Sequence, residues 1–383
     1  MTKTSKSKPQ ICFVLTVDYA VKAFLLNHLH ALSQYYDITV IVNTDKPNFL
    51  EEAGINAKII PLKIAREVSL LSDLICLLKL IKIFYSQRFV AVHSLMPKSG
   101  LLAMLAAWTL RVPLRVHTFT GQVWYAQVGL KRTVLRFFDK LIGNLTTINM
   151  ADGNAQLQFL INEKIISGKN TLVFAKGSIA GVDSLKFKPN QASKQAIRQQ
   201  LLIKADALVF LYVGRLNYDK GIMDLAAAFN ELNNMSACLI FAGPDEKSMQ
   251  AKIGAANTQS NSRMYFVGYT DAPQAYMAAA DVLCLPSYRE GFNNVTIEAS
   301  AVGIPAIASR IYGITDAVVD GETGLLHEPR DIEGIKNCMQ RLIDNKPLRL
   351  KLGEQARSRA IKDFDSNVIT QEWVNFYREN VLL

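Results

Sequence analysis

Three features that define other protein classes are missing from this 383-residue chain. Its five cysteines are scattered and form no Cys-x-x-Cys or Cys/His pairing, so the sequence predicts neither a disulfide framework nor a zinc site, and a reducing compartment fits best. No apolar run reaches the roughly 18–20 uncharged residues that cross a bilayer, and residues 11–17, ending before Asp18, are too short for a signal peptide. Residues 16–22, after the first expected strand, contain no glycine, which argues against the Gly-x-Gly-x-x-Gly fingerprint of an NAD-dependent dehydrogenase.

The excess positive charge lies in one half of the chain. Residues 1–185 hold 21 Lys/Arg and 11 Asp/Glu, whereas the remainder is neutral. This asymmetry favours an anionic partner for the first half, although simple solubility explains it equally well. An expected helix over 131–142 carries Arg132, Arg136 and Lys140 on one face, which indicates either a solvated outer face or an anionic membrane surface as partner. Because no recognised nucleic-acid-binding motif accompanies the charge, no nucleic acid is expected as a partner.

Short apolar strands alternate with longer amphipathic helices along the chain. Strands are expected at 11–17, 38–42, 57–60, 91–93, 114–117 and 172–174, and again at 208–213, 238–242, 264–267, 282–285 and 306–308. Continuous apolar runs of this length indicate parallel strands buried on both faces. The pattern predicts an α/β protein with two Rossmann-like doubly wound domains, residues 1–185 and 186–365, joined within the glycine-containing loop 176–189. Residues 366–383 form an expected C-terminal helix that is free to pack back on the N-terminal domain.

The most informative segment is residues 287–300, which read SYREGFNNVTIEAS. A helix is expected to begin near Asn294, directly after a strand and a polar loop. Ligands of open parallel sheets bind at the carboxyl ends of the strands, and a helix N-terminus there favours a diphosphate. The backbone N–H groups expected to face it belong to Asn293, Asn294 and Val295.

Two glutamates in this segment are suited to binding hydroxyl groups. Glu290 lies in the loop and can reach a bound sugar, whereas Glu298 lies one turn into the helix and can reach a ribose. Carboxylates beside a diphosphate are electrostatically costly, so hydroxyl binding suits both better than phosphate contact. Gly291 and Phe292 complete the expected lining of this substrate site.

A second loop, residues 213–221, reads VGRLNYDKG and supplies positive charge. Arg215 offers a planar fork for bidentate phosphate binding, and Lys220 offers a compact charge five residues later. Both would stabilise negative charge on a departing nucleoside diphosphate. No Asp-x-Asp motif is expected in the chain, so a metal ion is not expected to be required.

Together these segments resemble the retaining glycosyltransferases of family 4, which have the GT-B fold. The resemblance rests on Glu290 and Glu298 with seven residues between them, on the following runs GIPAIAS (303–309) and GETGLL (321–326), and on the 213–221 loop. It covers nearly the whole chain and is tightest over 208–330. It implies two domains facing a cleft, with a nucleotide-sugar donor held by the second domain.

In the first half, the run RVHTFTGQVW (115–124) is similar to a bacterial subgroup that makes capsule, O-antigen and other lipid-linked glycans. The resemblance implies that His117 faces the donor sugar, while a structural hydrogen-bonding role stays open. Gly121 would let backbone approach a ligand, and Trp124 could stack on a sugar or pack internally. Lys98 is a further candidate for the substrate site. The glycine-free loop 16–22 departs from the family pattern, which puts its acceptor contacts in doubt.

The resemblance implies transfer of a hexose or N-acetylhexosamine from a nucleoside-diphosphate sugar, expected to be a UDP-sugar, to a hydroxyl of a lipid-linked or oligosaccharide acceptor. No other cofactor is expected. The expected location is cytoplasmic, including a peripheral position on the cytoplasmic face of the inner membrane. Two alternatives remain: a GT-B-like nucleotide-sugar 2-epimerase, and a transferase with a soluble small-molecule acceptor.

Overall fold

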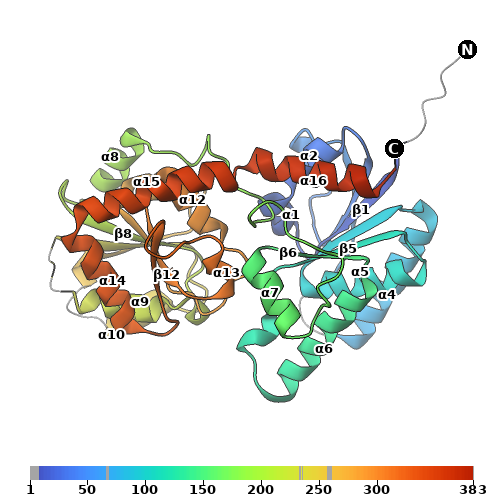
Figure 1. Cartoon of the computed structure of the whole chain (residues 1–383), viewed down its shortest axis with the longest axis horizontal. Coiled ribbons are helices and arrows are strands. Elements are labelled where there is room, and N and C mark those ends of the chain that lie inside the picture. Colours follow the sequence, from blue (N-terminus) through green and yellow to red (C-terminus); the bar gives the residue numbers. More distant parts are fainter. Residues whose placement is uncertain (1–7, 66–68, 233, 235, 257–260, 383) are drawn as a thin grey trace, which may run out of the picture. The chain divides into compact units, whose positions relative to one another are not determined.

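The computed structural model describes residues 8–65, 69–232, 234, 236–256 and 261–382. The chain divides into two compact units: unit 1 runs to Ala180 and is completed by the residues from Asn367 onward, and unit 2 is Gly181–Ser366 (Figure 1). None of the described helices combines the length and hydrophobicity that crossing a bilayer demands.

Unit 1 is built on a parallel sheet of seven described strands in the order β3-β2-β1-β4-β5-β6-β7. The strands are β1 (Gln10–Val14), β2 (Asp37–Val42), β3 (Ala57–Pro61), β4 (Ala91–Leu95), β5 (Leu114–Phe119), β6 (Ile148–Ala151) and β7 (Thr171–Leu172). The helices are α1 (Asp18–Phe24), α2 (Leu26–Leu32), α3 (Phe49–Glu52), α4 (Leu70–Gln87), α5 (Pro97–Thr109), η1 (Val123–Ala126), α6 (Gly129–Leu145), α7 (Asn154–Asn162) and α16 (Ser366–Asn380).

Side chains of β1 alternate between two hydrophobic cores, one on each face of this sheet. Ile11 and Phe13 join the core that contains Trp373 of α16, whereas Cys12 and Val14 join the core that contains α4 and α5. Successive strand residues point to opposite faces, so an uninterrupted apolar run is what a doubly covered strand needs. The predicted α/β class with parallel sheets is therefore confirmed in this unit.

Unit 2 repeats the theme with six described parallel strands in the order β10-β9-β8-β11-β12-β13. The strands are β8 (Leu208–Val213), β9 (Ala237–Ala242), β10 (Met264–Gly268), β11 (Val282–Leu285), β12 (Ala306–Ser309) and β13 (Gly324–His327). The helices are α8 (Gln191–Gln200), η2 (Tyr218–Lys220), α9 (Ile222–Asn230), α10 (Met249–Ala256), η3 (Asn261–Arg263), α11 (Pro273–Ala279), α12 (Asn294–Val302), α13 (Tyr312–Thr315), α14 (Ile332–Asp344) and α15 (Lys346–Asp363).

The C-terminal helix α16 is held on unit 1 by an aromatic cluster centred on Trp373. The indole lies between two imidazoles, with ring centroids 4.8 Å from His28 and 5.0 Å from His93. His28 Nε2 donates to the Ile179 carbonyl at 2.8 Å, which leaves Nδ1 to accept from the Thr370 hydroxyl at 2.9 Å. Burial of this ring lowers the pKa of His28 to about 4, against the smaller opposing effect of the Ile179 hydrogen bond.

This depressed pKa predicts a loss of stability in mild acid. An unfolded histidine titrates near 6.5, so below that pH the unfolded chain binds the proton more tightly than the folded one. With the pKa of His28 lowered to about 4, the free energy of unfolding falls by about 3 kcal/mol as the pH drops from about 6.5 toward 4. Above about pH 6.5 none of this stability is lost. His28→Gln should have a lower thermal unfolding midpoint at neutral pH. On acidification, this midpoint should fall by less than that of the parent protein.

His30 provides the matched control, because it lies on α2 as well but is exposed. His30→Gln should keep the parent midpoint and its full pH dependence in the same thermal titration. If His28→Gln also kept the full acid dependence, the buried imidazole would not be its source.

Candidate active site

The loop between β11 and α12, residues 286–293, is fixed on one side by the turn that follows β8. Gly221 ends η2 with φ +66°, and a Cβ added there would lie 2.0 Å from the Pro286 carbonyl oxygen. The Tyr288 N–H donates to the Asp219 carbonyl at 2.9 Å. Only glycine permits both this backbone conformation and this approach. The two loops predicted to bind the donor therefore meet through their backbones.

A second backbone contact fixes the same loop from the side of α13. A Cβ added to Gly313 would lie 2.5 Å from the Glu290 carbonyl oxygen and 2.4 Å from that of Gly291. The Asn293 N–H donates to the Gly313 carbonyl at 3.1 Å. Gly291 thus contributes to the site through its backbone, and Glu290 lies between two rigid turns.

These turns bring the predicted Lys220 and Glu290 into direct contact. Lys220 Nζ lies 2.8 Å from Glu290 Oε1, and the side chains are only 17% and 12% exposed. The pair is 70 residues apart in sequence. The pair lies at the carboxyl edge of a parallel sheet, where ligands of such sheets bind, and it offers a cation suited to phosphate and a carboxylate suited to hydroxyl groups.

Arg215 lies on the same turn but is not part of this pair. Its side chain is 52% exposed and approaches Glu246 at 3.3 Å. The turn itself is pinned by Tyr212, whose hydroxyl donates to the Arg215 carbonyl at 2.8 Å. Arg215 is therefore anchored by its backbone while its guanidinium remains accessible.

The predicted N-terminus of α12 is correct to the residue, but the role assigned to Asn293 is not. Asn293 is the buried N-cap, and its side-chain oxygen accepts from the Thr296 N–H at 3.1 Å. The backbone N–H of Asn293 donates to the Gly313 carbonyl, so Asn293 caps the helix and its backbone N–H is not available to a ligand. The helix begins at Asn294, and the Val295 N–H has no acceptor among the described residues.

Glu298 and Phe292 have different environments although both lie in the same segment. Desolvation raises the pKa of Glu298 to about 7, with a smaller opposing effect from Lys186. Its carboxyl group makes no hydrogen bond to another described residue, so it can accept one from a ligand. Phe292 packs on Phe364 with ring centroids 5.5 Å apart, so it supports the loop from beneath.

In unit 1, His117 is buried and does not have the exposure expected of a sugar-binding residue. The residue is 1% exposed, and Nδ1 is 2.8 Å from the Ser94 hydroxyl. The imidazole fills the space beside Gly100 of α5, where an added Cβ would lie 2.4 Å from Cε1. Burial lowers the pKa of His117 to about 3, so the ring is neutral. The structure places His117 in the packing of unit 1.

The other predicted residues of unit 1 are also held by internal contacts. Lys98 forms an ion pair with Asp73 of α4 at 2.7 Å. Trp124 is buried and donates from Nε1 to Asp139 at 2.7 Å, so it packs internally. Gly121 has φ +48°, which is consistent with a turn that requires glycine.

The expectation that the chain has no Asp-x-Asp motif is wrong, because Asp363-Phe364-Asp365 has this spacing, outside the two loops predicted to bind the donor. Asp363 pairs with Arg359 at 3.7 Å, and Asp365 accepts from the Ser184 hydroxyl at 2.8 Å. These carboxylates therefore stabilise the end of α15 and do not belong to the Lys220–Glu290 site.

Two supporting residues were not identified from the sequence. Tyr288 donates from its hydroxyl to Asp224 at 2.6 Å and ties the loop to α9. Gly313 provides the close approach described above. Tyr288 could have been found from the sequence, because it lies in the loop directly after β11. Gly313 gave no such signal, since it lies 23 residues from Glu290.

Comparisons with known proteins identify the family of this chain. A family model described as glycosyl transferases group 1 matches residues 193–359, and one described as glycosyl transferase 4-like matches residues 10–145. The Staphylococcus aureus capsular polysaccharide biosynthesis glycosyltransferase CapM is 30% identical over 341 residues, which is 88% of each chain. The Escherichia coli UDP-Gal:alpha-D-GlcNAc-diphosphoundecaprenol alpha-1,3-galactosyltransferase is 26% identical over 87% of this chain and 86% of its own.

A solved structure shows the same fold. Anabaena HepE in complex with UDP-glucose matches 97% of this chain and 99% of its own, with a TM-score of 0.80 at 18% identity. The chain has two parallel-sheet units, matches two glycosyltransferase family models and is 30% identical to a relative over most of both chains. This protein therefore belongs to the family-4 glycosyltransferases of the GT-B fold.

Proposed function

We propose that this glycosyltransferase transfers a hexose or N-acetylhexosamine from a UDP-sugar to a hydroxyl of a lipid-linked glycan during cell-surface polysaccharide synthesis, with retention of the anomeric configuration. The contact that carries the proposal is the Lys220–Glu290 pair beside the start of α12. Two relatives support the pathway: CapM, named for capsular polysaccharide, and the E. coli enzyme, named for a diphosphoundecaprenol acceptor.

Donor binding would exchange the partners of this ion pair. A diphosphate at the start of α12 attracts Lys220, because a phosphate carries more negative charge than one carboxylate. Glu290 is then left to accept hydrogen bonds from the sugar hydroxyls. The accessible guanidinium of Arg215 can swing from Glu246 to the second phosphate. Positive charge thus gathers where the leaving group becomes negative, without a metal ion.

The chemical step that fits these residues is same-face attack. The acceptor hydroxyl oxygen forms a bond to the anomeric carbon on the face from which the phosphate departs. The anomeric C–O bond breaks, and the departing phosphate oxygen takes the acceptor's proton. Glu290 and Glu298 bind hydroxyl groups in this scheme, so the pair does not act as the acid and base of a glycosidase.

Substitution of Lys220 tests the diphosphate role. Lys220→Met should lower kcat/KM by a factor on the order of 10²–10³, because charge on the leaving group loses a preorganised partner. The measurement is UDP release and product formation over a panel of UDP-sugars with a diphosphoundecaprenol-linked acceptor. Lys204→Met removes an exposed lysine of the same unit and should match the parent enzyme. Parent-like kcat/KM in Lys220→Met would reject the assignment.

The raised pKa of Glu298 predicts a pH-dependent donor affinity. The ionised carboxylate accepts hydrogen bonds from ribose hydroxyls, so protonation below about pH 7 should weaken binding about tenfold, the scale of one charge-assisted hydrogen bond. Calorimetry with UDP-glucose between pH 6 and 8.5 measures this. Glu298→Gln should bind weakly with little pH dependence, whereas Glu290→Gln should keep the parent profile. A flat profile in the parent protein would contradict the role of Glu298.

We further propose that unit 1 binds the anionic membrane surface on which a lipid-linked acceptor resides. Helix α4 exposes one continuous apolar face, from Ile75 at 46% exposed to Leu70 at 85%. The large exposed side chains of this face are Leu70, Leu71, Leu74, Ile75, Leu78 and Tyr85. Two exposed basic residues lie on the same helix, Lys79 at the edge of this face and Lys82 within it, between Leu78 and Tyr85 along the chain. An apolar face that carries basic residues matches the chemistry of an anionic lipid surface.

The exposed residues of α4 can be changed without disturbing the core. Leu74→Glu with Leu78→Glu should abolish co-sedimentation with phosphatidylglycerol-containing vesicles. The matched control, Leu185→Glu with Leu202→Glu, adds the same charges at exposed leucines of unit 2 and should sediment like the parent protein. Undiminished sedimentation of the α4 variant would exclude this helix as the contact.

A further inference from the structure

A cavity of about 780 Å³ lies within unit 2, at the edge of the sheet opposite the Lys220–Glu290 site. Its wall includes Leu208 and Asp281, at the amino ends of β8 and β11, together with residues of α8 and α15. Donor loops of an open α/β sheet lie at the carboxyl ends of the strands, so this cavity is separate from the donor site.

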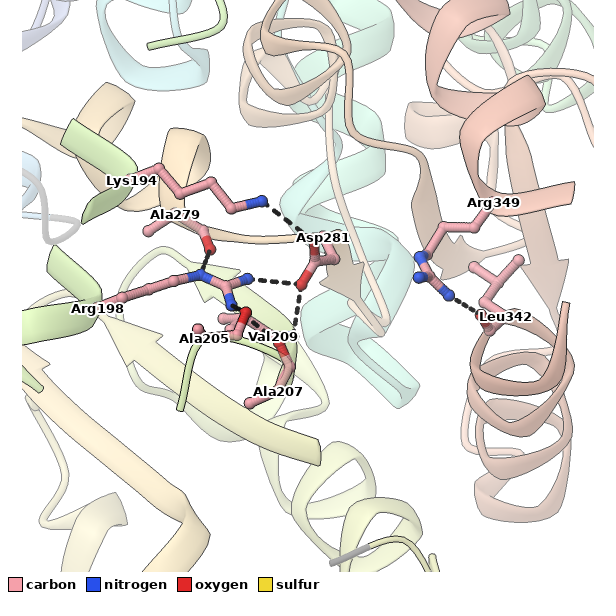
Figure 2. A network of polar contacts seen from close by, with 9 residues as sticks. All are labelled: Lys194, Arg198, Ala205, Ala207, Val209, Ala279, Asp281, Leu342 and Arg349. Atoms are coloured by element: carbon pink, nitrogen blue, oxygen red, sulfur yellow. Dashed lines mark hydrogen bonds and ion pairs between the residues drawn. The ribbon is translucent and has the colours of Figure 1, made fainter. Parts of the chain in front are cut away.

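One side of the cavity is a rigid polar wall built on Asp281. This carboxylate accepts from Arg198 Nη2 at 2.8 Å and from the Val209 N–H at 2.9 Å, and lies 3.5 Å from Lys194 Nζ (Figure 2). Arg198 also donates to the carbonyls of Ala205, Ala207 and Ala279. Arg198 and Asp281 therefore neutralise each other and hold the wall in place.

The opposite side carries positive charge without a matching carboxylate. Arg349, in the first turns of α15, donates one hydrogen bond to the Leu342 carbonyl (Figure 2). Lys346 begins the same helix and is exposed. Among the described residues, neither has an acidic group within ion-pair distance. Burial lowers the pKa of Arg349, and Asp281 is the one acidic group that opposes this shift.

The charge count of the lining identifies the ligand class. Four cations, Lys194, Arg198, Lys346 and Arg349, face two carboxylates, Asp206 and Asp281. The surplus of two positive charges matches a dianion, and a guanidinium fork beside an ammonium suits a phosphate group. The volume exceeds that of a phosphate ion, and Ile304, Pro305 and Leu350 add apolar wall.

We propose that this cavity is a binding site for a small phosphorylated molecule, whose phosphate lies between Arg349, Lys346 and Lys194 and whose organic part lies on the Ile304–Pro305 wall. The phosphate supplies the negative charge that Arg349 otherwise lacks, and the Arg198–Asp281 pair keeps its own contacts. The same chemistry would accept free phosphate or a sugar phosphate.

Calorimetry on the full-length protein at constant ionic strength tests this site with glucose 6-phosphate, inorganic phosphate and glucose. We expect glucose 6-phosphate to bind and glucose not to bind. Lys346→Met with Arg349→Met should weaken the affinity at least about tenfold, as expected for loss of two charge-assisted hydrogen bonds. The single variant Lys346→Met removes an exposed side chain without risk to the fold and should weaken binding in the same direction.

Two controls separate this site from the donor site and from general charge effects. Lys351→Met with Lys362→Met removes two exposed lysines of α15 that do not line the cavity, and should bind like the parent protein. Lys220→Met should also bind glucose 6-phosphate normally, whatever its effect on transfer. Tighter binding of glucose 6-phosphate than of inorganic phosphate assigns the site to sugar phosphates, and equal or weaker binding assigns it to free phosphate. If neither glucose 6-phosphate nor inorganic phosphate binds, or if the Lys346/Arg349 variant binds them undiminished, the proposal is overturned.

Discussion

The candidate active site depends on close backbone contacts around residues 286–293. Gly221 admits the Pro286 carbonyl, and Gly313 admits the carbonyls of Glu290 and Gly291, at distances that no Cβ would tolerate. Since these contacts are made by backbone, the position of Glu290 does not depend on its own side-chain hydrogen bonds. Glu290 can therefore exchange Lys220 for another partner while the loop that carries it stays in place.

The Lys220–Glu290 pair is shielded enough for its charges to matter to each other. Exposed ion pairs contribute little to stability, whereas loss of one partner from a shielded pair leaves the other charge uncompensated. A single substitution at either position thus combines a functional loss with a local electrostatic cost. The combination Lys220→Met with Glu290→Gln removes both charges and isolates the functional part, since neither charge is then left without its partner.

Sequence patterns predicted the strands where apolar residues run without interruption, and missed β6 and β13. The run INMA of β6 contains a polar residue, and β13 begins with a glycine that approaches the Ala306 carbonyl, so neither resembles an isolated buried strand. After β1, the chain forms two short helices, α1 and α2, which are divided at Leu25. Such boundaries depend on tertiary packing, which local periodicity does not encode.

The contact between Lys220 and Glu290 was predictable, because both residues lie in loops that follow the carboxyl ends of strands. His117 was expected at the end of a strand but lies within β5, where its imidazole is buried against Gly100 of α5. Asn293 was correctly placed at the start of α12, yet whether an N-cap amide is available depends on Gly313, twenty residues further along the chain. In both cases a distant glycine decides the role of the polar residue.

The same distinction applies to the basic helix α6. Its spacing correctly placed Arg132 and Arg136 on one face, but both approach Glu163 and lie over the Trp124 ring. Their positive charge is thereby partly neutralised within unit 1, which weakens the electrostatic argument for α6 as a membrane-binding helix. On α4 the large exposed side chains are mainly apolar, and Lys79 and Lys82 form no ion pair with a described residue. At a lipid surface, insertion of the apolar side chains and attraction of the lysines would therefore act together. The proposed contact with an anionic lipid surface is therefore assigned to α4 and not to α6, the helix with the more conspicuous basic pattern.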